Sequence, residues 1–208
     1  MTADRPHVIS TVAELEALFG QVGEGSIRKE VATLPAHYQA LIQASPFALL
    51  ATAGRAGMDV SPRGDPAGFV HVQDERTLLL PERRGNNRVD SLRNILVDPR
   101  VALLFLIPGV GETLRVSGRA TISVEPALLE RLAMNGQPPK CVLVIRVERA
   151  MFQCARAIKR SNLWRPVAPD APRPVPTPGQ MLEALTQAAI DGAAYDRELP
   201  RRQQESLY

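Results

Sequence analysis

Short apolar runs separated by polar turns dominate the middle of the chain. Residues 100–107 (RVALLFLI) have the length and composition of one buried strand. Residues 113–124 alternate instead, so Leu114 and Val116 should face the core while Arg115 faces away from it. The other strand candidates are residues 47–53, 58–61, 68–72, 76–80 and 141–150. Turns of hairpin length join most of them, which favours an antiparallel sheet closed into a barrel over a parallel βαβ arrangement.

Helical periodicity flanks these strands. Thr11 and Glu14 form a capping box at the start of residues 11–22, in which four apolar residues share one face: Val12, Leu15, Leu18 and Phe19. Proline precedes and follows residues 36–44, which predicts a second helix there. Residues 126–134 and 179–191 have helical patterns as well. The pattern therefore predicts a mainly β protein with flanking helices, of the α+β class.

Three regions of different composition divide the 208 residues. Residues 1–45 form an N-terminal helical segment, and residues 46–166 contain the strands of the predicted barrel. Residues 167–208 comprise a proline-rich arm, a helix and a polar tail that we expect to be mobile.

Composition excludes several classes of function. The formal net charge is only +3 and aromatic residues make up 4% of the chain, so we expect no nucleic acid partner. The first residues lack a leader pattern and no apolar run is long enough to span a membrane, so we expect no membrane association. Cys141 and Cys154 lack metal-ligand spacing, which predicts reduced thiols in a cytoplasmic protein without a metal site.

One junction, PERRGNNRVDSLRNI at residues 81–95, concentrates basic residues where a strand gives way to a helix. The helix should begin near Asn87, with Asn86 or Asn87 as its N-cap. A helix N-terminus has free backbone N–H groups and a positive dipole end, and arginines add bidentate donors for phosphate. This predicts an anion site formed with Arg83, Arg84 and Arg88. An ordinary capped loop, with its arginines paired to Glu82 and Asp90, accounts for the spacing equally well.

A second polar segment, SPRGDPAGF at residues 61–69, favours the anion site. It contains Arg63, Gly64 and Asp65 between two prolines that stiffen a bend. Alone it can be read as a stiff turn with a surface ion pair of little energetic value. Two junctions rich in arginine and glycine on sequential strands of one small barrel can, however, converge on one ligand.

Four motifs give the chain a family resemblance. They are SPRGDP at residues 61–66, PERRGNNRVDSLRN at 81–94, FLIPGVGETLRVSGRA at 105–120 and SNLW at 161–164. Their sequence and order resemble the pyridoxamine 5′-phosphate oxidase-like family of FMN-binding split β-barrels, in particular a subgroup of FMN-dependent enzymes. The resemblance covers roughly residues 47–166 and implies an antiparallel split barrel that forms a homodimer, with FMN bound at the subunit interface.

The resemblance also implies roles for individual residues. Arg63 and Arg88 would hold the FMN phosphate, with Asn86 and Asn87 near the ribityl chain. Four further residues would lie around the cofactor: Pro81, Arg83, Ser91 and Asn94. Lys159, Ser161 and Trp164 would reach the flavin of the partner subunit. No general acid or base is evident, so the catalytic residues and the small-molecule substrate stay unassigned.

The leading interpretation is thus an FMN-binding oxidoreductase. The alternatives are a flavin-binding protein without turnover, a split barrel that binds haem or a deazaflavin, and a dimeric interaction module. The segment PGVGETLRV has no third glycine at the dinucleotide spacing and is read as a hairpin turn.

Overall fold

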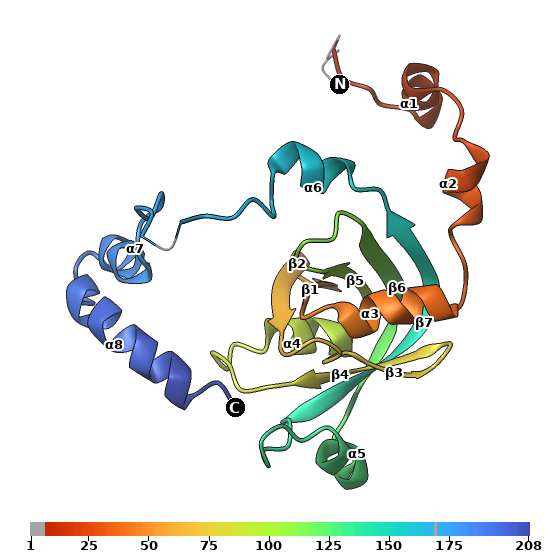
Figure 1. Cartoon of the computed structure of the whole chain (residues 1–208). Coiled ribbons are helices and arrows are strands. Elements are labelled where there is room, and N and C mark those ends of the chain that lie inside the picture. The colour runs from red at the N-terminus through yellow and green to blue at the C-terminus, as the bar shows by residue number, and fades with distance from the viewer. Residues whose placement is uncertain (1–6, 169) are drawn as a thin grey trace.

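Seven strands form one antiparallel sheet in the computed structural model, which describes residues 7–168 and 170–208 (Figure 1). They are β1 (Phe47–Gly54), β2 (Gly57–Gly64), β3 (His71–Asp74), β4 (Thr77–Glu82), β5 (Arg100–Leu106), β6 (Thr113–Ser123) and β7 (Cys141–Gln153). Their order across the sheet is β2-β1-β5-β6-β7-β4-β3. The predicted fold class, an antiparallel split barrel of the α+β type, is confirmed.

The core lies inside the curled sheet, where alternate residues of β1, β5 and β6 are buried, while β4 buries four consecutive residues, Leu78 to Pro81. On β6, Leu114 and Val116 are buried and Arg115 is exposed, as the alternation predicts. The largest members of the core are Phe105, Leu50, Leu78, Leu80, Leu103, Leu143 and Ile145, with Leu34 and Ile42 from the N-terminal segment. Burial of about 1.5–3 kcal/mol per large apolar side chain makes this core the main source of stability.

Three strand boundaries differ from the prediction by three residues, and one of them is the end of β7, which lies at Gln153 instead of residue 150. Strand β2 continues through Pro62 to Gly64 instead of bending there. Because β2 is an edge strand, a proline without an N–H donor is tolerated in it. Strand β3 begins at His71 instead of residue 68, because Gly68 has φ of 86° and the Phe69 N–H donates to the carbonyl of Pro66 in a turn.

The helices before the barrel follow the predicted pattern in part. Helix α3 (Ala36–Ala44) has the predicted bounds, and α1 (Val12–Phe19) begins with the predicted capping box. The apolar face of α1 is nevertheless exposed, and Phe19 is 78% accessible. Helix α2 (Glu24–Arg28) had no sequence signal. Helix α4 (Asp90–Val97) follows β4, α5 (Pro126–Arg131) follows β6, and α6 (Arg156–Ser161) follows β7.

The predicted boundary between a helix at residues 179–191 and a polar tail after it is wrong. Helix α7 (Pro178–Leu185) is followed by a second helix, α8 (Gly192–Glu205), which includes most of the tail. Gln187 and Ala188 have positive φ and end the first helix, and Asp191 caps the second. The two helices pack as a hairpin at Gly179, where an added Cβ would lie 2.0 Å from the carbonyl oxygen of Gly192.

Figure 1 shows how the chain ends relate to the barrel. Helices α1 and α2 extend to one side, and the α7–α8 hairpin lies on the other, with the end of α8 returning toward the loop after β4. No helix in the described part of the chain is both long enough and apolar enough to cross a membrane.

Candidate functional site

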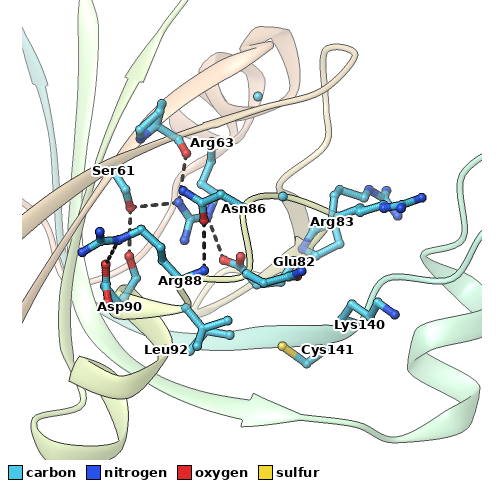
Figure 2. Close-up of a pocket in the computed structure, with 18 of the residues that line it drawn as sticks. Ser61, Arg63, Glu82, Arg83, Asn86, Arg88, Asp90, Leu92, Lys140 and Cys141 are labelled. Carbon is cyan, nitrogen blue, oxygen red and sulfur yellow. Dashed lines mark hydrogen bonds and ion pairs between the residues drawn. The ribbon is translucent and has the colours of Figure 1, made fainter. Parts of the chain in front are cut away.

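A pocket of about 450 Å³ lies where the two ends of the curled sheet approach each other. We call it the seam pocket. Its walls come from β2 (residues 59–64), from the end of β4 through the start of α4 (residues 81–92), and from Lys140 and Cys141 at the start of β7. Strands β2 and β4 are not neighbours in the sheet, and the side chains of Arg63 and Glu82 reach across the space between them (Figure 2).

Two ion pairs cross this seam and link the two polar motifs reciprocally. Nε of Arg63 on β2 lies 2.8 Å from Oε1 of Glu82 on β4. In the second pair the arginine follows β4 and the carboxylate follows β2: Nε of Arg83 lies 2.9 Å from Oδ2 of Asp65. All four side chains are largely buried, and that of Asp65 is only 3% exposed. The two motifs therefore meet in one place, and their convergence on one ligand stays a prediction. Loss of either partner of a pair would leave a buried charge uncompensated.

Arg63 is held at three points. Besides its bond to Glu82, its Nη1 donates to the Ser61 hydroxyl and to the carbonyl of Pro62, each at 2.9 Å. The Ser61 hydroxyl also lies 2.9 Å from that of Ser91 on α4, which in turn donates to Asp59. This network fixes the guanidinium against the wall of the pocket, so it is pre-positioned for an anionic group.

The N-terminus of α4 differs from the prediction. Its N-cap is Val89, in the left-handed conformation with φ of 53°, and not Asn86 or Asn87. Asn86 is used elsewhere, because its Oδ1 accepts the backbone N–H of Arg88 at 3.1 Å and closes a local turn. Asn87 is also left-handed, with φ of 58°. The helix therefore starts later, at Asp90, and both asparagines belong to the loop that forms the rim of the pocket.

The remaining basic residues differ in how they are paired. Arg88 lies at the exposed rim with its Nε 2.7 Å from Asp90, and this bond raises the pKa of the Arg88 side chain. Arg84 and Lys140 line the pocket without an ion-pair partner among the described residues. The capped-loop alternative thus describes the pairing of Arg88 with Asp90 correctly, but Glu82 pairs with Arg63 of the other motif and not with an arginine of this loop.

Three other predicted residues of this region fall in two places. Pro81 and Ser91 line the pocket, as Arg63, Arg83, Asn86, Asn87 and Arg88 do. Asn94 does not, because its Nδ2 donates to the hydroxyl of Thr52 at 3.1 Å beneath β1. It fills the space above Gly54, where an added Cβ would lie 1.9 Å from the Asn94 Oδ1.

The late motif lies away from the seam pocket of its own chain. Lys159 and Ser161 are exposed on α6, and the indole N–H of Trp164 donates to the carbonyl of Val110 at 2.6 Å. Val110 belongs to the β5–β6 turn, which is the hairpin turn predicted for PGVGETL. That this segment reaches a flavin in a partner subunit stays a prediction.

Several lining residues escaped the sequence reading. Asp59 and Ser61 face the pocket because they alternate with outward residues on β2. Lys140 and Cys141 are distant in sequence and belong to no polar motif, so only the pairing of β4 with β7 brings them here. Burial, and then the carboxylate of Glu82, raise the pKa of the Cys141 thiol, which favours its neutral form. Phe69 and Leu92 add apolar surface.

The chain is similar to several proteins of solved structure. The search of curated proteins found no match. Among solved structures, HupZ of Group A Streptococcus is 22% identical over 56% of this chain and 90% of that one, with a TM-score of 0.46. A Clostridium acetobutylicum protein related to general stress protein 26 is 15% identical over 57% of this chain and 86% of that one, with a TM-score of 0.45.

General stress protein 26 from Bacillus anthracis str. Sterne is 16% identical over 54% of this chain and 88% of that one, with a TM-score of 0.42. The sequence profile described as pyridoxamine 5′-phosphate oxidase matches residues 34–154, which include all seven strands. Because that match covers more than half of the chain, the protein belongs to the pyridoxamine 5′-phosphate oxidase family.

Proposed function

We propose that the protein binds FMN in the seam pocket and acts as an FMN-dependent oxidoreductase, with a second copy of the chain completing the site in a homodimer. The observation that carries the proposal is the seam pocket itself, where two arginine-bearing motifs meet at a cavity of about 450 Å³. That volume lies within the range of about 300–1,000 Å³ typical of small-molecule sites.

The charges of the pocket suit a phosphate group. Five basic side chains line it (Arg63, Arg83, Arg84, Arg88 and Lys140) against three carboxylates (Asp59, Glu82 and Asp90). The surplus is positive, and guanidinium groups match phosphate oxygens with paired hydrogen bonds. Arg63 and Arg88 would hold the phosphate, with Asn86 and Asn87 near the ribityl chain.

The other walls suit the rest of the cofactor. Ser61 offers a hydroxyl, while Phe69 and Leu92 offer apolar surface for a planar ring. When bound, the isoalloxazine would supply the hydride or electron chemistry. The chain would bind the cofactor, orient it and shield one side of it from water. The substrate is not identified by these residues.

The pocket favours a flavin over haem. Haem iron takes an axial ligand such as histidine, thiolate, methionine or tyrosine. Of these, the described lining residues supply only Cys141, whose raised pKa opposes the thiolate form. The haem alternative therefore lacks a suitable ligand in this pocket.

The outer face of one sheet edge supports the homodimer. It faces away from the core and contains Arg100 at its end and six apolar side chains: Met58, Val60, Phe47, Leu49, Leu104 and Leu106. Met58 and Val60 are 77% and 60% exposed. A group of exposed apolar side chains of this kind often marks a surface that another protein molecule covers. Strand β2 contributes to this face and to the seam pocket, so a partner docked here would lie beside the site.

Purification and reconstitution test the proposal. We expect protein purified after expression to be yellow, or the apoprotein to bind added FMN in a fluorescence-quenching titration. Oxidation of NAD(P)H by the loaded protein would then separate an enzyme from a flavin-binding protein without turnover. Colourless protein that takes up no FMN would overturn the cofactor assignment.

Replacement of Arg63 tests the phosphate contact. We expect Arg63→Ala to weaken FMN binding by about 1–3 kcal/mol, because one charged hydrogen bond to phosphate is lost. Riboflavin, which lacks the phosphate, is the matched ligand, and its affinity should change much less. Arg115→Ala, on the outer face of β6, is the control variant. Equal losses for FMN and riboflavin would assign Arg63 a structural role only.

A further inference from the structure

The carboxylate of Asp65 has two donors, one from the loop after β4 and one from the residue at position 208. Its Oδ2 accepts Nε of Arg83 at 2.9 Å, and its Oδ1 accepts the hydroxyl of Tyr208 at 2.7 Å. The Asp65 side chain is 3% exposed, so both bonds are made away from water. A buried carboxylate needs such donors, and the loss of one leaves an oxygen unsatisfied.

The Tyr208 bond is also the attachment of the C-terminal arm, defined here as residues 166–208. The hydrogen bonds of the arm otherwise stay within it, so among the described residues this is the only one that joins the arm to the barrel. Figure 1 shows the end of α8 returning toward the loop after β4. The arm thus leaves the barrel after α6 and reattaches beside the seam pocket.

The third member of the network lines the pocket. Arg83 is fixed at two points, because its Nη1 donates to the carbonyl of Leu132 at 2.9 Å while its Nε holds Asp65. It is 15% exposed and forms part of the pocket wall. The position of its guanidinium therefore depends on the orientation of the Asp65 carboxylate.

We propose that Tyr208 is a positioning residue that acts through Asp65 on Arg83, so that docking of the C-terminal arm and anion binding in the seam pocket favour each other. With the Tyr208 hydroxyl in place, the Asp65 carboxylate takes one donor from each side. Without it, the carboxylate turns both oxygens to the Arg83 guanidinium and draws that charge away from the pocket. The hydrogen bond that the Tyr208 hydroxyl donates to the Asp65 carboxylate raises the pKa of Tyr208. The phenol therefore stays protonated and can donate throughout the neutral range.

The coupling rests on the proposed function, in which FMN is the ligand of the seam pocket, and it acts in both directions. If the docked arm strengthens FMN binding by some factor, FMN must strengthen arm docking by the same factor.

Docking of the arm can be followed by its cleavage with trypsin. Arg165 and Arg173 both precede proline and resist cleavage, so cuts in the arm fall at Arg197, Arg201 and Arg202 of α8.

The test compares Tyr208→Phe with Tyr195→Phe in the full chain. Tyr195 lies on α8 with its ring against Arg202, and its hydroxyl forms no hydrogen bond with a described residue, so it is the matched control. We expect Tyr208→Phe to raise the FMN dissociation constant by about threefold to tenfold and to speed tryptic cleavage of α8. FMN should slow that cleavage in the wild type and no longer do so in Tyr208→Phe.

A double-mutant cycle with Asp65→Asn separates positioning from a general loss of structure. If Tyr208 acts through the Asp65 carboxylate, Tyr208→Phe should have little further effect on FMN affinity in the Asp65→Asn background. The Nε–H resonance of Arg83 in the NMR spectrum of the ligand-free protein gives a second readout that needs no FMN. It should shift in Tyr208→Phe and stay in place in Tyr195→Phe.

The outcomes are distinct. Wild-type protein that binds no FMN would overturn the proposed function, and the Arg83 resonance and α8 cleavage would still decide the positioning role. FMN affinity unchanged in Tyr208→Phe, additive effects in the cycle, or an Arg83 resonance that does not move would each overturn the inference.

Discussion

Val89 is the residue whose backbone conformation fits its side chain least. It is β-branched, it lies in the left-handed region with φ of 53°, and it caps α4 without a side-chain hydrogen bond. A left-handed L-residue costs roughly 1–2 kcal/mol, and a branched side chain is among the worst suited to it. Such strain is often found where a loop is held in shape for a ligand. Val89 lines the seam pocket, which agrees with that pattern.

Relief of this strain gives a stability prediction. Asparagine tolerates the left-handed region, so we expect Val89→Asn to raise the free energy of unfolding of the apoprotein by about 0.5–1 kcal/mol. Urea denaturation followed by circular dichroism measures it. Val97→Asn, at an exposed valine with ordinary φ at the end of α4, is the control and should show no gain. A loss of stability in Val89→Asn as large as in the control would contradict the strain argument.

At the residue scale, the sequence predicted the meeting of the two motifs but not their pairing. Arg63 and Asp65 are close in sequence, and a local ion pair between them was the simple reading. Instead Arg63 crosses the seam to Glu82 and Asp65 crosses it to Arg83, because Arg63 and Asp65 lie two residues apart at and just after the end of β2 and so point to the same side. Asn94 does not line the seam pocket, since helical periodicity turns it under β1 toward Thr52.

At the element scale, one ion pair joins the helix that carries the site to the strand behind it. Asp98 ends α4, and its carboxylate binds Arg100, the first residue of β5. The side-chain hydrogen bond from Arg100, followed by its backbone N–H, lowers the pKa of Asp98 to about 2. The folded pKa is depressed, so the pair stabilises the fold above the unfolded value of about 3.9.

This pair gives a prediction on pH dependence. As pH falls from about 4 toward about 2, Asp98 is protonated and its contribution is lost. We therefore expect Asp98→Asn to be less stable than the wild type at neutral pH, with a difference that shrinks across this window. Asp170→Asn, in the proline-rich arm, is a control without an ion pair among the described residues. A difference that stays constant from neutral pH to pH 2 would refute the role of Asp98.

Elements with strong local signals were predictable, and those that depend on tertiary contacts were not. Helix α3 has prolines at both ends, and α1 has a capping box, so their positions follow from sequence. Helix α8 reads as a polar tail because its composition gives it no apolar face. It forms a hairpin with α7 through the close contact of Gly179 with Gly192 and the bond from the Gly179 N–H to Asp196.

At the scale of the whole molecule, the split in the barrel and the candidate site are the same feature. Backbone hydrogen bonds hold the sheet from β2 round to β3, but side-chain ion pairs close the gap between β2 and β4. A closed barrel would fill this space with strand backbone. The open seam leaves a cavity lined by charged groups, which is the arrangement that a phosphate-bearing ligand requires.

The exposed apolar face of β2, β1 and β5 gives the last prediction. If this face joins two copies of the chain, a charge placed on its strand β2 should separate them, since an unpaired carboxylate in an apolar interface is costly. We expect wild-type protein to be a dimer in light scattering and Val60→Glu to be a monomer with a retained melting transition. Val124→Glu is the matched control, because Val124 is similarly exposed, at 66% against 60%, but lies beyond the end of β6.

FMN affinity gives a second measurement of the same contact. FMN should bind Val60→Glu more weakly than Val124→Glu, because β2 lines the pocket as well as this face. A monomeric wild type, or a Val60→Glu variant that stays dimeric, would place the subunit contact elsewhere.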